Sequence, residues 1–309
     1  MESEFIAWLR EHLPSHPQLR LGPGDDAAVL RLAHGSECVV TTDLLTDGVD
    51  FELDRVDPRR IGRKALAVNL SDIAAMASQP VAAVIAVALP RAGGFELARG
   101  LYEGLAPLAA RYRVALAGGD TNYWDGRLVI SVTLIGEPTD RGPLRRAGAL
   151  PGDRIVVTGQ FGGSILGRHL DFEPRVDEAL LLHERYALHA GIDVSDGLSL
   201  DLGRLCDESG CGAVVWPDAI PISPDARRLT DERACGMTPL DHALSDGEDF
   251  ELILAVPAAV ADRMTAEQPI EAGLTVIGEF VAERGLWQRS AAGAILPLER
   301  RGFEHKGAP

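Results

Sequence analysis

The sequence predicts two domains, each built from mixed strands and helices in an α/β or α+β arrangement. The 309-residue length suits two domains of ordinary size. Strand-like and helix-like patterns are interleaved in both halves of the chain. A basic stretch rich in turn residues, "TDRGPLRRAGALPGD" (139–153), separates the two sets. We therefore expect one domain over residues 1–138 and a second over 139–309.

The first half begins with "EFIAWLREHL" (4–13), whose apolar spacing predicts a short amphipathic helix. Pro58 is expected to open a helix that continues to residue 78, because apolar residues follow it at helical spacing. "VAAVIAVALP" (81–90) predicts a buried strand that ends at a proline. The other expected elements are strands over 27–32, 37–43, 114–120 and 127–137, and a helix over 93–113.

In the second half, "RIVVTG" (154–159) predicts a strand and "GGSILGRHL" (162–170) the opening of a helix. "LSLDLGRLCDESG" predicts a helix that ends at Gly210. The remaining expectations are a helix over 177–190 and strands over 213–216, 249–257 and 274–280.

Composition excludes several classes of protein. The formal net charge of −16 argues against non-specific binding to nucleic acid or to an anionic membrane surface. The N-terminus lacks the basic start and apolar core of a signal peptide, and the most apolar stretch is too short to span a bilayer as a helix. We expect a cytoplasmic protein whose four cysteines, Cys38, Cys206, Cys211 and Cys235, are reduced and mostly buried thiols.

Acidic residues recur where apolar segments stop. Each one alone could be a turn residue or a helix cap. Asp72 is harder to explain in this way, because it lies inside an apolar helical segment, on the same face as Asn69. A buried carboxylate without a partner costs several kcal/mol or changes its protonation. The recurring acids are Asp25, Asp26, Asp43, Asp72, Asp120, Asp193 and Asp196.

If these acids converge, their mutual repulsion must be relieved by cations. Mg²⁺ takes carboxylate oxygens, waters and substrate phosphates as ligands, so several Mg²⁺ ions that bridge phosphates would explain the pattern. This interpretation predicts phosphoryl transfer. Neither the Walker loop nor the protein-kinase motifs occur, so glycine backbone and a few basic groups must hold the nucleotide. The basic candidates are Lys64, Arg145 and Arg146.

Several motifs together resemble the thiamine-monophosphate kinase family. In chain order they are "GPGDDAAV", "TTDLLTDGVDF", "KALAVNLSDIAAMASQP", "ALAGGDT", "RAGALPGD", "IDVSDGLSLDL" and "SDGEDFELILAVP". The resemblance runs from the first helix to "GFEHK" near the C-terminus. It implies a two-domain synthetase-like fold in which the N-terminal sheets of a homodimer pair into a β-barrel. It also implies that ATP and thiamine monophosphate react to give ADP and thiamine diphosphate.

The resemblance also implies roles for individual residues. The N-terminal domain would bind ATP and Mg²⁺ and form the dimer, and the C-terminal domain would complete the active site. The implied magnesium ligands are Asp26, Thr41, Thr42, Asp43, Asp72, Asp120, Asp193 and Asp196, of which Asp43, Asp72 and Asp120 are the expected catalytic carboxylates. The implied ATP contacts are Tyr102, Gly119, Asp120, Arg146 and Ser195. The implied substrate contacts are Asp50, Glu248 and Phe303; Asp50 stands where many members carry His.

Other functions fit these residues less well. A further ATP-dependent ligase or synthetase of the same superfamily is the main alternative. Selenophosphate synthetase is disfavoured because no cysteine precedes Cys38, and the hydrogenase maturation protein because the chain ends "HKGAP" without a cysteine. A non-catalytic nucleotide or Mg²⁺ sensor is disfavoured because every acidic motif is intact.

Overall fold

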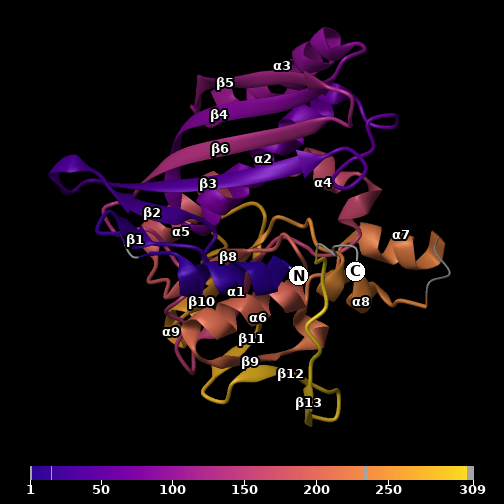
Figure 1. Ribbon diagram of the computed structural model, residues 1–309. Helices are drawn as coiled ribbons and strands as arrows, with labels where there is room; N and C mark the ends of the chain where they lie inside the picture. The colour runs from indigo at the N-terminus through magenta and orange to yellow at the C-terminus, as the bar shows by residue number, and fades with distance from the viewer. Residues whose placement is uncertain (1, 15, 233–235, 305–309) are drawn as a thin grey trace.

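The computed structural model describes residues 2–14, 16–232 and 236–304. It contains two β-sheets, one from each half of the chain, with helices packed between and around them (Figure 1). This confirms the predicted fold class. Among the described residues, no helix has both the length and the apolar character needed to cross a membrane.

The first sheet has six strands in the order β1-β2-β3-β6-β4-β5. Neighbouring strands are antiparallel except β4 and β5, which are parallel. The strands are β1 (Leu19–Leu21), β2 (Ala28–Arg31), β3 (Glu37–Thr46), β4 (Ser78–Pro90), β5 (Ala115–Trp124) and β6 (Val129–Pro138). The helices of this half are α1 (Glu2–His12), α2 (Pro58–Ala75) and α3 (Gly94–Arg111), and a 3₁₀ turn, η1 (Ala33–Gly35), precedes β3.

The second sheet has seven strands in the order β13-β12-β9-β11-β7-β10-β8. Only the β9–β12 pair is parallel. The strands are β7 (Arg154–Thr158), β8 (Ala190–Asp193), β9 (Gly212–Val215), β10 (Leu252–Val256), β11 (Leu274–Val281), β12 (Gly285–Arg289) and β13 (Ile295–Pro297). The helical segments are η2 (Ser164–Leu166), α4 (Arg168–Asp171), α5 (Val176–Arg185), α6 (Leu198–Ser209), η3 (Pro217–Ala219), α7 (Pro224–Glu232), α8 (Pro239–Ser245) and α9 (Ala258–Glu267).

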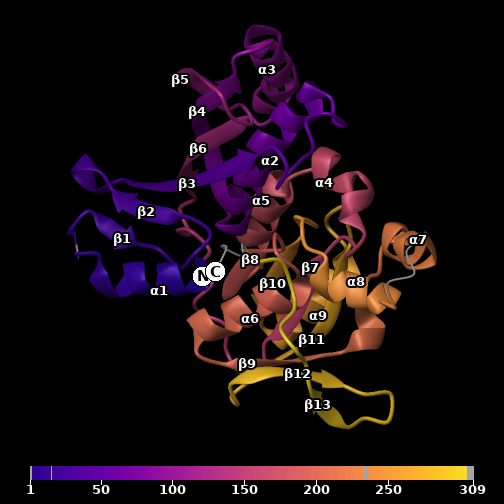
Figure 2. The same cartoon turned by 45° about the vertical axis from the view of Figure 1, so that its right-hand side comes forward.

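Helix α2 lies at the junction of the two halves (Figure 2). Asp57 caps its start by accepting a 2.8 Å hydrogen bond from the Arg59 N–H, and Pro58 occupies the first turn. The helix packs against α3 and the first sheet on one side and against α5 and β8 of the second half on the other. One apolar core therefore continues through both halves, joining Leu66 of α2 to Val156 of β7.

Three expectations need correction. Strand β4 is buried on one face only, since Val81 and Val84 are each 41% exposed. The segment 162–170 forms a 3₁₀ turn and a four-residue helix, because Gly163 and Gly167 adopt positive φ angles. The helix expected to reach residue 190 ends at Arg185, since Ala190 begins strand β8 at the edge of the second sheet.

Candidate active site

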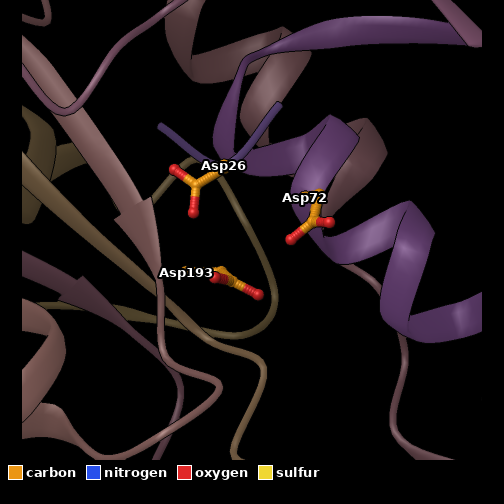
Figure 3. A group of neighbouring side chains, drawn as sticks. All are labelled: Asp26, Asp72 and Asp193. Atoms are coloured by element: carbon orange, nitrogen blue, oxygen red, sulfur yellow. The ribbon is translucent and has the colours of Figure 1, made fainter. Parts of the chain in front are cut away.

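Three carboxylates from distant parts of the sequence converge between the two sheets. One carboxylate oxygen from each of Asp26, Asp72 and Asp193 lies within 4.8 Å of the others. Figure 3 shows the three side chains turned toward a common centre. Asp26 comes from the loop before β2, Asp72 from the C-terminal part of α2, and Asp193 from the end of β8. The predicted convergence of these three acids is therefore present in the structure.

Neighbouring hydroxyl and guanidinium groups fix the three carboxylates. The Thr41 hydroxyl donates to Asp72 at 2.5 Å, and the Ser71 hydroxyl donates to Asp193 at 2.6 Å. Arg146 donates to Asp26 at 2.6 Å. These contacts hold the acids in place but provide only one positive charge for three carboxylates.

Burial and mutual repulsion raise the pKa values of Asp72, Asp193 and Asp43. The pKa of Asp72 lies well above its usual value because of desolvation and then the charges of Asp43, Asp193 and Asp26. The pKa of Asp193 is also raised well above its usual value, by desolvation and then by Asp26. Desolvation, followed by the charges of Asp50 and Asp196, raises the pKa of Asp43 to about 6. A bound cation would relieve this repulsion.

Two buried carboxylate oxygens also lack partners. Among the described residues, neither Asp26 Oδ2 nor Asp43 Oδ2 has a hydrogen-bond donor. Buried polar atoms in folded proteins are almost always paired, so these oxygens are available to bind a ligand. Oxygen atoms of this kind, in a group of several acids, suit a hard divalent cation such as Mg²⁺.

Alternation along β3 separates the adjacent threonines. Thr41 and Asp43 share the face that packs toward α2, as residues two apart in a strand should. The Thr42 hydroxyl instead hydrogen-bonds the Val132 carbonyl at 3.2 Å and contacts the Thr133 hydroxyl. The structure therefore does not bring the Thr42 side chain to the acidic cluster.

Asp120 also lies apart from the cluster within one chain. It is exposed on β5, the edge strand of the first sheet, where its register partner on β4 is Ala86. Strands β6 and β4 separate β3 from β5, so three strand spacings of about 4.8 Å place Asp120 roughly 14 Å from β3. Gly119 shares this exposed edge, and Tyr102 is exposed on α3.

The loop after β8 carries Ser195 and Asp196. The backbone N–H groups of Asp196 and Gly197 donate to the Asp201 carboxylate at 2.9 and 3.0 Å. Arg204 bridges the carboxylates of Asp196 and Asp201. Asp201 and Arg204 were not predicted, although their spacing of five and eight residues after Asp196 places them on the first turns of the following helix.

Arg146 and Asp25 lie beside Asp26. The Arg146 guanidinium is partly buried, and its backbone N–H lies 3.2 Å from an Asp25 oxygen. Desolvation, and then the charge of Asp26, raises the pKa of Asp25 to about 6. Arg145, the neighbouring candidate, is exposed.

Two of the three predicted substrate contacts, Asp50 and Glu248, lie beside the N-terminal half of α2. Lys64 Nζ donates to the carboxylate of Glu248 and, at 2.8 Å, to the carbonyl oxygen of Asp50. Phe303 is half-exposed, and its backbone N–H donates to the Asp196 carbonyl at 2.9 Å. Lys64, a nucleotide candidate in the sequence, therefore lies beside two of the substrate candidates, Asp50 and Glu248.

The cysteines fit the sequence interpretation where the structure describes them. Cys38, Cys206 and Cys211 are free and buried. Cys235 lies outside the described residues.

Comparison with known proteins identifies the family of the chain. A family profile described as "AIR synthase related protein, N-terminal domain" matches residues 24–137, and its C-terminal counterpart matches residues 151–286. The chain is 42% identical to a thiamine-monophosphate kinase of Rhodopirellula baltica, with 99% of this chain and 97% of the relative covered. It is 33% identical to that of Caulobacter vibrioides, over 92% of this chain and 85% of the relative.

The fold is also similar to that of solved structures. A solved structure described as "AaThiL complexed with AMPPCP and TMP" superposes with a TM-score of 0.84 at 26% identity, covering 99% of this chain and 97% of the other. The full-length sequence match and the shared two-sheet architecture lead to one assignment. The chain belongs to the thiamine-monophosphate kinase family of AIR synthase related proteins.

Proposed function

We propose that this protein transfers the γ-phosphoryl group of ATP to thiamine monophosphate, giving ADP and thiamine diphosphate. The observation that carries the proposal is the buried cluster of Asp26, Asp72 and Asp193 in a chain of this family. The related structure with bound AMPPCP and TMP supports the same pair of ligands.

We also propose that several Mg²⁺ ions bind at this cluster. Asp26, Asp43, Asp72 and Asp193 would hold them, because their oxygens are buried, close together and in part without partners. The wider predicted set adds Thr41, Thr42, Asp120 and Asp196. Bound Mg²⁺ would neutralise the charge of the two phosphate-bearing substrates.

The residues of the chain would act by position and charge. An oxygen of the thiamine monophosphate phosphate attacks the γ-phosphorus of ATP, a new P–O bond forms, and the bond to the ADP oxygen breaks. The attacking oxygen is already anionic at neutral pH, so no side chain needs to remove a proton. Arg146, partly exposed beside Asp26, would contribute a positive charge to ATP phosphates.

The other site assignments are proposals of the same kind. Tyr102, Gly119, Asp120, Arg146 and Ser195 would contact ATP, and Asp50, Glu248 and Phe303 would contact thiamine monophosphate. Phe303 has a half-exposed ring suited to stacking on a flat heterocycle.

We further propose a homodimer, with an N-terminal domain over residues 1–138 and a C-terminal domain over 139–309. All ten residues of the edge strand β5 are exposed, which is unusual for a strand of a stable sheet and suits pairing with a second copy. A second copy would also offer a place for Asp120 near a cluster that it does not reach within one chain. A cytoplasmic location fits the use of ATP.

One assay tests the proposed function. Purified protein should convert thiamine monophosphate to thiamine diphosphate in the presence of Mg-ATP, followed by the fluorescent oxidation product of thiamine diphosphate. Omitting ATP or adding EDTA should abolish product. Folded protein that makes no thiamine diphosphate under these conditions would refute the proposal.

A further inference from the structure

Lys64 is a buried cation outside the acidic cluster. It lies on α2 and is only 1% exposed. Burying an ammonium group is costly unless it is paired and hydrogen-bonded. Its partners are the Glu248 carboxylate and the Asp50 carbonyl oxygen, so it ties α2 to one loop from each half of the chain.

The first of these loops is the turn that follows β3. The Asp50 carboxylate accepts a 2.6 Å hydrogen bond from the Thr46 N–H, so it closes the turn on itself. The Gly48 N–H donates to the Phe51 carbonyl at 2.7 Å, and the Phe51 ring is buried. Lys64 binds the carbonyl at the centre of this turn and thereby fixes the turn against α2.

The second loop is the one that precedes β10, and its backbone is strained. Glu248 and Phe250 have φ angles of 51° and 52°, in the left-handed region that non-glycine residues rarely occupy. The Glu248 N–H donates to the Ser195 carbonyl at 2.6 Å. Such backbone strain persists only where surrounding contacts hold it, and it clusters at functional sites. The Lys64–Glu248 ion pair is one of those contacts.

The place of Lys64 on α2 separates it from the phosphate-binding cluster. Asp72 follows Lys64 by eight positions, which corresponds to about 12 Å along the helix axis. The two residues differ by about 80° around the helix, so they project from the same side of α2. One end of this side therefore carries the acid cluster, and the other carries the Lys64–Glu248 pair.

His169 completes the surroundings of the pair. Desolvation, and then the Lys64 charge, lowers the pKa of His169, whose Nδ1 lies 2.8 Å from the Ser164 carbonyl oxygen. A neutral His169 adds no second cation here. Glu248 is the group beside Lys64 that is still partly exposed, with 33% of its side chain accessible.

We infer that Lys64 is a positioning residue for the acceptor substrate and not a nucleotide anchor. It holds one Glu248 oxygen and the turn at Asp50, which leaves the rest of the Glu248 carboxylate to accept hydrogen bonds from the thiamine heterocycle. This inference rests on the proposed function. The phosphate of the acceptor would then extend along α2 toward Asp72.

Steady-state kinetics with Lys64→Met test the inference. Losing a charged hydrogen-bond partner should raise KM for thiamine monophosphate by about 10- to 100-fold. KM for ATP should stay within about twofold, because the altered contacts lie on the acceptor side. Combining Lys64→Met with Glu248→Gln should raise the acceptor KM far less than the product of the two single effects, since both changes break one unit.

A matched control is Arg63→Met, which removes a neighbouring cation of α2 that pairs with Glu173 away from the site. It should leave both KM values unchanged. Lys64→Gln keeps a donor without the charge and serves if Lys64→Met does not fold; its acceptor KM should again rise selectively.

Different results would contradict the role of Lys64 and the proposed function. Active wild-type protein with an unchanged acceptor KM in the Lys64 variants, or with a larger rise in KM for ATP, overturns the role given to Lys64. Wild-type protein that neither turns over thiamine monophosphate nor binds it in calorimetry overturns the proposed function, and this inference with it.

Discussion

Asp72 is the residue of the acidic cluster whose unusual role the sequence indicates most strongly. Its place inside an apolar helix predicts an unusual role, and the structure confirms that it meets Asp26 and Asp193. Thr42 and Asp120 could not be placed in this way. The neighbours of a strand residue depend on pairing register and on the partner strands, which the local pattern does not contain.

Replacing Asp43 or Asp72 by Asn tests the electrostatic role of the cluster. We expect each change to reduce kcat by about 100- to 1000-fold, the scale of losing one preorganised charge contact. The metal-free variants should melt at a higher temperature than wild type, because a repelling charge has been removed from a buried site. Turnover measurements and thermal melts in EDTA would show both effects.

Asp54→Asn is a suitable control for these variants, because that side chain is 78% exposed. It should leave kcat and the melting temperature unchanged. Wild-type turnover by Asp72→Asn at saturating Mg²⁺ would contradict the electrostatic role.

Among the elements, α2 was predicted most completely. Its proline start and long apolar spacing are strong local signals, and the observed helix, Pro58–Ala75, ends three residues before the predicted limit. The short helices α7, α8 and α9 were missed, since seven to ten residues give few turns of periodicity. The β4 sequence reads as buried on both faces because its exposed face also carries apolar residues, Val81 and Val84, so the polar alternation of a half-exposed strand is absent.

Strand β5 and the face beside it lead to a prediction about assembly. Val84 on β4 is 41% exposed in the single chain, so Val84→Glu should leave the fold intact. If this face contacts a second copy, the buried charge should dissociate the dimer. Light scattering should give twice the 33.0 kDa chain mass for wild type and the single-chain mass for the variant.

The control for this change lies in the other sheet. Leu296 on β13 is 48% exposed, and Leu296→Glu should not alter the mass. A wild-type protein that is monomeric over the micromolar range would contradict the proposed dimer.

For the whole molecule, the raised pKa values predict how pH and Mg²⁺ affect stability. The pKa of Asp43 is about 6 in the folded state against an ordinary value of 3.8, so the folded state binds this proton more tightly. The resulting stabilisation is present below about pH 4 and is lost as the pH rises through about 6. Bound Mg²⁺ should replace it at higher pH.

Thermal melts with Mg²⁺ or with EDTA would measure this linkage. The Mg²⁺-dependent rise in melting temperature should be larger at about pH 8 than at about pH 5, because protons compete with the metal for the same carboxylates. Asp72→Asn should show a smaller rise at both pH values. An equal rise in wild type at both pH values would refute the coupling.

Helix α2 also has a consequence for the integrity of the chain. The apolar side chains that bury it come from both halves, so the turn-rich connection at residues 139–153 divides the sequence but does not divide the packing. If the chain were cut there and the two fragments separated, α2 and α5 would each expose an apolar face to solvent. Neither fragment would then keep its native shape alone, and local melting of that helix would separate Asp72 from Asp26 and Asp193.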